Sequence, residues 1–152
     1  MTTETEGYAE WLDHLTDEVK KAIHGMNAEE LEWTPLEDDT NSPCVIATHI
    51  AGTVGYHVHQ LVGGMDVGRD RDAEFAAHGA TAAELEALLD RTAETTRRVL
   101  LAASTDDLDG SVERPGQPPV TGRWAILHTL EHVGEHLGHL NLTQQLYAVR
   151  EG

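Results

Sequence analysis

Four segments of the sequence carry apolar residues at the spacing of an amphipathic helix, and this spacing restricts what the chain can fold into. They run over about residues 3–26, 42–62, 81–103 and 121–148. In each segment apolar residues recur at i, i+3, i+4 and i+7, which places them on one helix face. No run alternates apolar and polar residues for long enough to predict a strand. We therefore expect an all-α fold, a four-helix bundle formed by a single domain, 1–152.

The ends of these segments carry helix-capping residues. Two pairs have the spacing of a capping box, Thr3 with Glu6 and Thr81 with Glu84. Ser42 precedes a proline, which suits the cap and the first position of a helix. The connections between the helices are longer than a minimal bundle needs, which favours crossover wiring or functional loops.

Two features of the predicted helices bear on packing. Gly52 and Gly55 lie inside the second helix, where each costs about 1 kcal/mol relative to alanine. A close neighbour would explain such glycines. The segment 121–148 has apolar residues nearly all round its middle, so we expect it to be the most buried helix.

The charge balance excludes several classes of function. Lys and Arg number 10 against 27 Asp and Glu, for a formal charge of −17. Such a chain repels phosphate backbones and anionic lipid, so we expect no nucleic-acid partner and no membrane partner. The single cysteine, Cys44, rules out a disulfide framework within one chain and is best explained as a packing residue. Residues 1–6 lack the parts of a secretory signal, so we expect a reduced, cytoplasmic location.

The pattern of the ten histidines carries most of the functional information. The last helix bears four of them, His128, His132, His136 and His139, within an arc of ~80° at about 100° per residue. His136 and His132 lie nearest the apolar face. An i, i+4 pair can direct both imidazoles at one metal ion, so these two are the best candidate ligands. His128 and His139 are expected beside the site or on the surface.

A third ligand has to come from elsewhere, because two residues hold a metal poorly in water. The second helix offers His49, His57 and His59. His59 points away from the apolar arc of that helix, His57 lies within the arc, and His49 sits at its edge. Periodicity alone ranks His57 slightly above His49 and leaves the choice open.

Two other metal chemistries fit the sequence less well. The last helix contains H-x-x-E-H twice, a zinc-peptidase pattern, but Glu131 and Glu135 lie away from the apolar face. A di-iron carboxylate bundle needs Glu-x-x-His on two helices, and no histidine of this chain has a glutamate three residues before it.

At two places the sequence resembles the DinB/YfiT-like superfamily of proposed metalloenzymes. The segment 41–52, NSPCVIATHIAG, preceded by WTP at 33–35, is similar to the family's second-helix motif. The segment 120–140, VTGRWAILHTLEHVGEHLGHL, is similar to its last-helix motif. The resemblance covers nearly the whole chain and implies an up-down-down-up four-helix bundle with long connections.

The resemblance also implies the site. In the family one histidine of the second helix and an i, i+4 pair of the last helix hold the metal, which here would be His49, His132 and His136. The resemblance thus favours His49 over His57. Three neutral nitrogen ligands and an open position suit Zn²⁺, Ni²⁺ or Fe²⁺. Some relatives use mycothiol, bacillithiol or glutathione, which the metal would bind as a thiolate.

Three functions are therefore in competition. The first is a metal-dependent enzyme, a thiol-dependent S-transferase or isomerase acting on a small electrophile as its small-molecule substrate. The second is a non-catalytic metal-binding or stress-response bundle with a structural histidine site. The third is an interaction module, such as a homodimer formed through two helices. An open coordination position would favour the enzyme, and a fourth protein ligand would favour the structural site.

Overall fold

Four long helices form the body of the computed structural model, which describes residues 3–37 and 39–150. The long helices are α1 (Glu4–Ile23), α3 (Pro43–Val54), α5 (Ala82–Ala102) and α7 (Gly122–Val149). The helix α3 continues directly into a π-helix, η1 (Gly55–Val62). Shorter elements fill the connections: α2 (Ala28–Glu32), α4 (Arg71–Phe75), α6 (Thr105–Asp109), β1 (Ser111–Arg114) and β2 (Gln117–Thr121). The predicted all-α class is confirmed, while residues 1–2 and 151–152 of the expected domain lie outside the described ranges.

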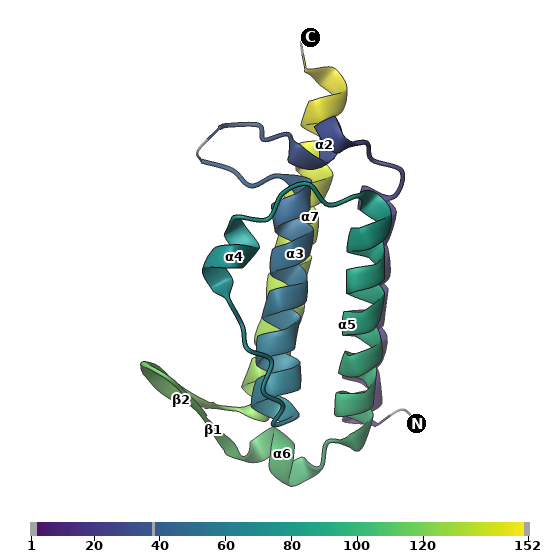
Figure 1. The fold of residues 1–152 in the computed structure, drawn as a ribbon. Coiled ribbons are helices and arrows are strands. Elements are labelled where there is room, and N and C mark those ends of the chain that lie inside the picture. The colour runs from purple at the N-terminus through teal and green to yellow at the C-terminus, as the bar shows by residue number, and fades with distance from the viewer. Residues whose placement is uncertain (1–2, 38, 151–152) are drawn as a thin grey trace.

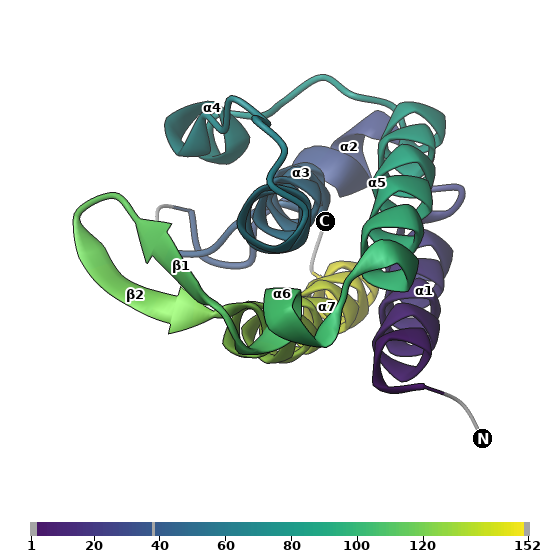
Figure 2. The same ribbon diagram turned by 90° about the horizontal axis from the view of Figure 1, so that it is seen from below.

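Each of the four long helices packs against two of the others. Both α1 and α3 pack against α5 and against α7. In Figure 1, α1 runs upward, α3 and η1 run downward, α5 runs downward and α7 runs upward. The connection between η1 and α5 climbs back through α4 along the outside of α3. Figure 2 shows that α4 and the β1–β2 hairpin lie on the side of α3 and α7 that faces away from α1 and α5.

The capping residues predicted from the sequence are confirmed. Thr3 and Thr81 each form a capping box with the glutamate three residues later. The Ser42 hydroxyl accepts from the Val45 N–H, and the proline between them occupies the first turn of α3. These side chains satisfy N–H groups that have no partner inside the helix.

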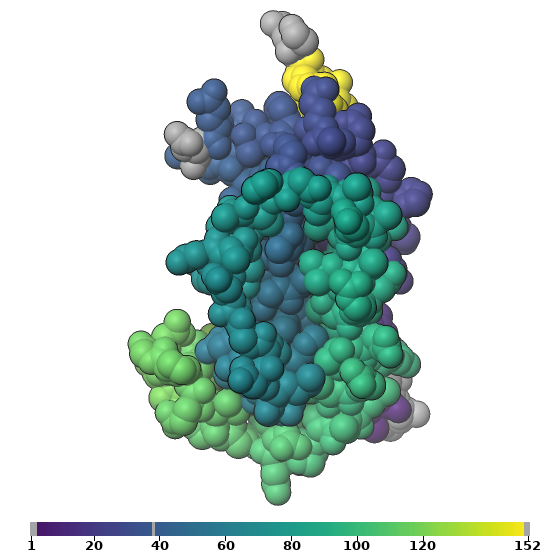
Figure 3. Space-filling model, in the orientation of Figure 1, coloured from purple at the N-terminus to yellow at the C-terminus, as the bar shows by residue number. Residues whose placement is uncertain are grey.

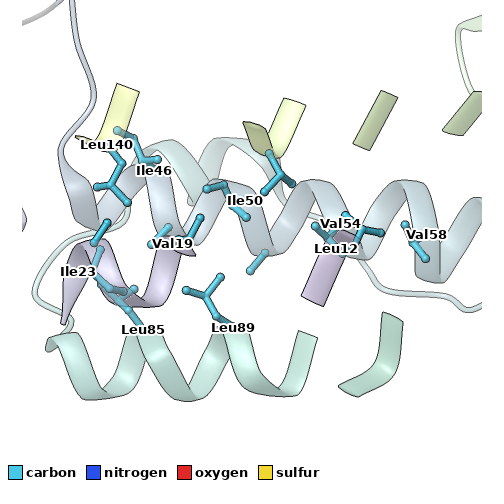
Figure 4. Close-up of a cluster of buried hydrophobic side chains, with 14 of the residues drawn as sticks. Leu12, Val19, Ile23, Ile46, Ile50, Val54, Val58, Leu85, Leu89 and Leu140 are labelled. Carbon is cyan, nitrogen blue, oxygen red and sulfur yellow. The ribbon is translucent and has the colours of Figure 1, made fainter. Parts of the chain in front are cut away.

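The core lies where the four long helices meet. Figure 4 shows side chains of α1, α3, η1, α5 and α7 interdigitating, among them Ile23, Ile50, Leu89 and Leu140. Ten of the twelve residues of α3 are buried. The expectation that α7 would be the most buried helix is wrong, since Leu127 and Leu142 on that helix are about half exposed. The helices α2, α4, α5 and α7 all pack against α3, and the periodicity of the last helix could not reveal this.

A β-hairpin occupies part of the connection before α7, where the sequence predicted no strand. The antiparallel strands β1 and β2 pair Ser111 with Thr121 and Val112 with Val120. Gly116 in the turn has a φ of 74°, a conformation that favours glycine. Pro118 and Pro119 are tolerated because each strand of a two-stranded hairpin is an edge strand.

The π-helix changes which histidines of the second helix are buried. A π-helix bonds i to i+5, so it turns less per residue than the α-helix assumed for 42–62. His59, which was expected to point away from the core, is buried and lies 2.9 Å from Thr96 Oγ1 of α5 through its Nε2 atom. The prediction for His59 is therefore wrong, because the helical period changes at Gly55.

No helix in residues 3–37 and 39–150 is long and apolar enough to cross a membrane. This agrees with the absence of a long apolar run in the sequence.

Replacing Thr96 with valine should destabilise the protein, because the buried His59 Nε2 would lose its partner. An unsatisfied buried polar group costs about 1–3 kcal/mol, so the free energy of unfolding in urea should fall by about that amount. Thr95→Val is the matched control, since the half-buried Thr95 hydroxyl accepts from the exposed Arg98 and not from a buried group. Equal effects of the two substitutions would contradict a structural role for the His59–Thr96 contact.

Candidate metal centre

Three histidines from two helices meet between α3 and α7. His49 of α3 is buried, and His132 and His136 of α7 are half-buried. The His132 Nε2 atom lies 3.0 Å from the Nε2 of His49 and 3.1 Å from the Nε2 of His136. All three donor atoms lie within 4.8 Å of one another. Because two of these residues are an i, i+4 pair on one helix, α7 supplies two donors and α3 completes the group.

The His49 ring is held by a buried carboxylate. Its Nδ1 lies 2.8 Å from Glu74 Oε2, so Nδ1–H donates to the carboxylate and Nε2 keeps a free lone pair. Glu74 belongs to α4, in the connection between η1 and α5. The Phe75 ring also packs against the His49 ring, tilted by 42° and with ring centroids 4.6 Å apart. Such an arrangement fixes the tautomer and the direction of the imidazole.

Arg69 balances the buried Glu74 carboxylate. Its Nε donates to Oε1 at 2.7 Å and its Nη2 to Oε2 at 2.9 Å, a bidentate pair. The same Nη2 donates to the Thr53 hydroxyl at 3.2 Å. Burial alone would raise the pKa of Glu74, but the hydrogen bonds from Arg69 and His49 outweigh it and the pKa is lowered. Glu74 is therefore an anion at neutral pH, as an acceptor for the His49 N–H has to be.

Burial keeps the three clustered imidazoles neutral. It lowers the pKa of His49, an effect that the Glu74 hydrogen bond partly opposes. It also lowers the pKa of His132 and brings the pKa of His136 to about 4. Neutral imidazole is the form that binds metal, so burial prepares all three residues for that role near pH 7.

The donor set fits a divalent transition metal. Three neutral imidazole nitrogens converge here, and the protons on them are too few for every close nitrogen pair to form a hydrogen bond. A cation that accepts the free lone pairs would fit between them. An ion about 2.0–2.1 Å from each nitrogen would hold tetrahedral ligands about 3.4 Å apart, close to the observed separations. Among residues 3–37 and 39–150, no fourth His, Cys, Asp or Glu joins this group.

The other histidines that the sequence singled out lie around this group or away from it. His57 is buried, but its Nδ1 donates to the Thr53 carbonyl at 3.1 Å, and burial lowers its pKa to about 4. Its ring packs on His128, which in turn stacks on His132. His139 is exposed beside His136. The structure thus places His49 in the group with the α7 pair. His57 lies outside the group and contacts His128.

Glu74, Arg69 and Phe75 were missed by sequence reasoning. They lie in the connection between the second and third predicted helices, with no periodicity to mark them. One signal was present: Gly52, one turn after His49, was expected to face a close neighbour. A Cβ at Gly52 would lie 2.0 Å from Glu74 Oε1, so the glycine makes room for the carboxylate. Cys44 is buried in the core with a raised pKa, which confirms its role as a packing residue.

A cavity of about 310 Å³ borders the Arg69–Glu74 pair. It is lined by Gly52, Gly55, His59, Leu88 and Thr92, together with the ion pair itself. Figure 3 shows the corresponding hollow along α3, between the α4 connection and α5. None of the three clustered histidines is among its lining residues.

Replacing Gly52 with alanine should destabilise the protein. An exposed glycine-to-alanine change in a helix would normally stabilise by about 1 kcal/mol. Here the new methyl group would displace the Glu74 carboxylate from its buried partners. In the Glu74→Ala background the obstacle is gone, so Gly52→Ala should become neutral or stabilising. Urea unfolding of the two single variants and the double variant measures the coupling, and additive effects would contradict it.

Comparison with known proteins places the chain in a family. The family model for mycothiol S-transferase matches residues 8–148. No curated protein is significantly similar to the chain.

Three solved structures share the fold. A DinB-like protein from Bacillus subtilis has a TM-score of 0.70 and 17% identity, covering 98% of this chain and 95% of that one. A conserved protein from Enterococcus faecalis has a TM-score of 0.79 and 16% identity, covering 99% and 100%. A mutant of the mycothiol-dependent maleylpyruvate isomerase has a TM-score of 0.68 and 13% identity, covering 91% of this chain but only 61% of the isomerase.

At these identities the structural likeness shows the fold alone, whereas the family match covers most of the sequence. The resemblance to DinB-like proteins is confirmed, and the chain belongs to the mycothiol S-transferase family.

Proposed function

We propose that this protein is a metal-dependent thiol S-transferase that joins mycothiol to a small electrophile. The observation that carries the proposal is the convergence of three neutral histidine Nε2 atoms. The match to the mycothiol S-transferase family supports mycothiol as the thiol. Bacillithiol and glutathione are alternative thiols, and isomerisation is an alternative outcome of the same thiol chemistry.

In this proposal His49, His132 and His136 hold a Zn²⁺, Ni²⁺ or Fe²⁺ ion. A bound ion would supply a thiolate at neutral pH by lowering the pKa of the coordinated thiol. Glu74 keeps the Nε2 of His49 available as a donor by accepting the Nδ1 proton. Three protein ligands leave at least one position for an exogenous sulfur, which favours the enzyme over a purely structural site.

The aromatic side chains beside the histidines would shield the reacting atoms from water. Phe75 covers the His49 ring, and Trp124 stacks on His128 at a centroid distance of 4.8 Å. Excluding water strengthens the electrostatic interactions of the bound thiolate and limits competing hydrolysis.

Two further expectations stay part of this proposal. A reduced cytoplasm would keep a thiol substrate in its reactive form, and the buried free thiol of Cys44 is compatible with such a compartment. A homodimer would cover exposed apolar side chains such as Trp11 and Leu142.

Alanine replacements should identify the metal ligands. His49→Ala, His132→Ala and His136→Ala should each abolish stoichiometric binding of a divalent transition metal, because two remaining ligands hold it poorly. His57→Ala is the matched control: it removes a buried neighbouring imidazole and should leave the metal in place. Metal content after dialysis measures the result, and circular dichroism checks the fold. Loss of metal from His57→Ala together with retention in His49→Ala would reverse the assignment.

Thiol binding should be visible in the cobalt-substituted protein. Mycothiol should produce a thiolate-to-Co²⁺ charge-transfer band, because its sulfur would occupy the open position. The His132→Ala variant should lose the band. If neither mycothiol, bacillithiol nor glutathione changes the spectrum between pH 6 and 9, the thiol mechanism is wrong and the site is a structural metal site.

A further inference from the structure

The Thr53 hydroxyl of α3 is directed differently from the hydroxyls of other helical threonines in this protein. Three of those donate at 2.8–2.9 Å to the backbone carbonyl four residues earlier in their own helix: Thr48, Thr92 and Thr129. Such a bond is common for a threonine inside a helix. The Thr53 Oγ1 atom instead lies 3.5 Å from His49 Nε2 and 3.2 Å from Arg69 Nη2. Its hydroxyl is therefore turned toward the histidine group.

The His49 nitrogen that faces Thr53 is the one that would bind the metal. The other ring nitrogen, Nδ1, donates to the Glu74 carboxylate. His132 Nε2 lies 3.0 Å from His49 Nε2, and Thr53 Oγ1 lies 3.5 Å from the same atom. Thr53 follows His49 by four residues on α3, so the helix holds the hydroxyl beside the imidazole. The hydroxyl thus adjoins the place where the histidine donors converge.

Arg69 determines which way the Thr53 hydroxyl donates. A guanidinium can only donate, so Arg69 Nη2 is the donor of their contact and Thr53 Oγ1 is the acceptor. The hydroxyl therefore keeps its own proton for another acceptor. Arg69 is itself held in place by its bidentate pair with Glu74. A cationic donor on the oxygen also polarises the O–H bond, which makes the hydroxyl a stronger donor.

A metal ion at the site would change the acceptor that the Thr53 proton can use. The ion would take the lone pair of His49 Nε2, to which the hydroxyl can donate. An unpartnered buried donor is costly, so the hydroxyl would need another acceptor. The ligands of one ion adjoin one another, so a ligand in the open position would lie next to His49 Nε2, as Thr53 does. A thiolate sulfur there carries the negative charge that strengthens such a bond.

The burial of these residues decreases from Thr53 outward. Thr53 and His49 are 1% and 3% exposed, whereas His132 and His136 are half-buried. A sulfur atom that enters past the α7 pair would therefore meet the Thr53 hydroxyl at the inner end of the site. A hydrogen bond in such a water-poor environment is stronger than one at the surface.

We propose that the Thr53 hydroxyl donates a hydrogen bond to the anion in the open coordination position, the thiolate sulfur, and that Arg69 is the positioning residue that sets its direction. This inference rests on the proposed thiol-transfer function and adds the residue that recognises the sulfur. The three histidines would hold the ion, and Thr53 would stabilise its anionic ligand. In the competing arrangement the Thr53 oxygen binds the ion itself, and the metal affinity distinguishes the two.

The test begins with Thr53→Val, which removes the hydroxyl and keeps the shape of the side chain. Thr53→Ser restores a hydroxyl. Thr129→Val is the matched control, because Thr129 is also fully buried and its hydroxyl donates to the Ala125 carbonyl of its own helix. Competition with a chelator should give the same Co²⁺ affinity for the wild-type protein and all three variants. Loss of Co²⁺ affinity in Thr53→Val alone would make Thr53 a metal ligand and overturn the proposal.

Mycothiol binding to the Co²⁺-loaded proteins is then followed through the thiolate-to-Co²⁺ charge-transfer band. Thr53→Val should bind mycothiol about tenfold more weakly, because it lacks a hydrogen bond to a charged atom. Its band should also move to longer wavelength, because a hydrogen bond lowers the energy of the sulfur electrons. Thr53→Ser and Thr129→Val should match the wild-type protein. An unmoved band in Thr53→Val, with or without weaker binding, would overturn the proposal, since a purely structural effect leaves the wavelength unchanged.

Azide separates this inference from the proposed function, because it is a small anion that binds an open metal position and accepts a hydrogen bond. Suppose that no thiol produces a band in the wild-type protein, while azide binds Co²⁺-loaded Thr53→Val about tenfold more weakly than the wild-type protein and Thr53→Ser. The thiol transfer is then wrong and the Thr53 donor stands. If mycothiol and azide each bind Thr53→Val as tightly as the wild-type protein, the donor is wrong and the thiol function stands. A wild-type protein that binds no divalent metal overturns both, and circular dichroism checks the fold of each variant.

Discussion

The buried contact between Glu74 and His49 is the interaction on which the rest of the site depends. A carboxylate in the interior is costly unless it is paired and hydrogen-bonded, and Glu74 meets both conditions through Arg69 and His49. The contact attaches the connection between η1 and α5 to the face of α3. It also sets the tautomer of His49, so that its free lone pair faces the two histidines of α7. Fold and candidate chemistry thus depend on the same ion pair.

The contact also accounts for several features of the surrounding chain. Gly52 makes space for the carboxylate, although glycine weakens a helix. Phe75, the residue after Glu74, packs against the His49 ring. Arg71, one turn earlier on α4, lies over Phe75. A five-residue helix in a long connection therefore contributes both the carboxylate that supports His49 and the ring that packs against it.

The local charge of the site differs from that of the whole molecule. The chain is strongly acidic, yet the histidine group consists of three neutral imidazoles and lies beside one balanced Arg69–Glu74 pair. A divalent ion held by neutral ligands keeps its charge, so anions would be attracted to this region and repelled elsewhere. Such a distribution suits the binding of a thiolate. The net charge of the whole chain therefore argues against a nucleic-acid partner, but it does not predict the local charge at the histidine group.

The sequence by itself determined the helical class, the starts of the four long helices and the placement of His132 and His136 on one helix face. These depend on local rules: apolar spacing, capping side chains, and the stacking of i and i+4 residues on one helix face. Periodicity left His49 and His57 open, and only the family motif favoured His49. The tertiary structure decided what local rules cannot reach. The π-helix shifted the helical period and buried His59, and the packing of four elements around α3 made that helix, rather than α7, the centre of the core. Glu74 and Arg69 reach the site from the connection between η1 and α5, because the pairing of a buried charge is decided only when the helices pack.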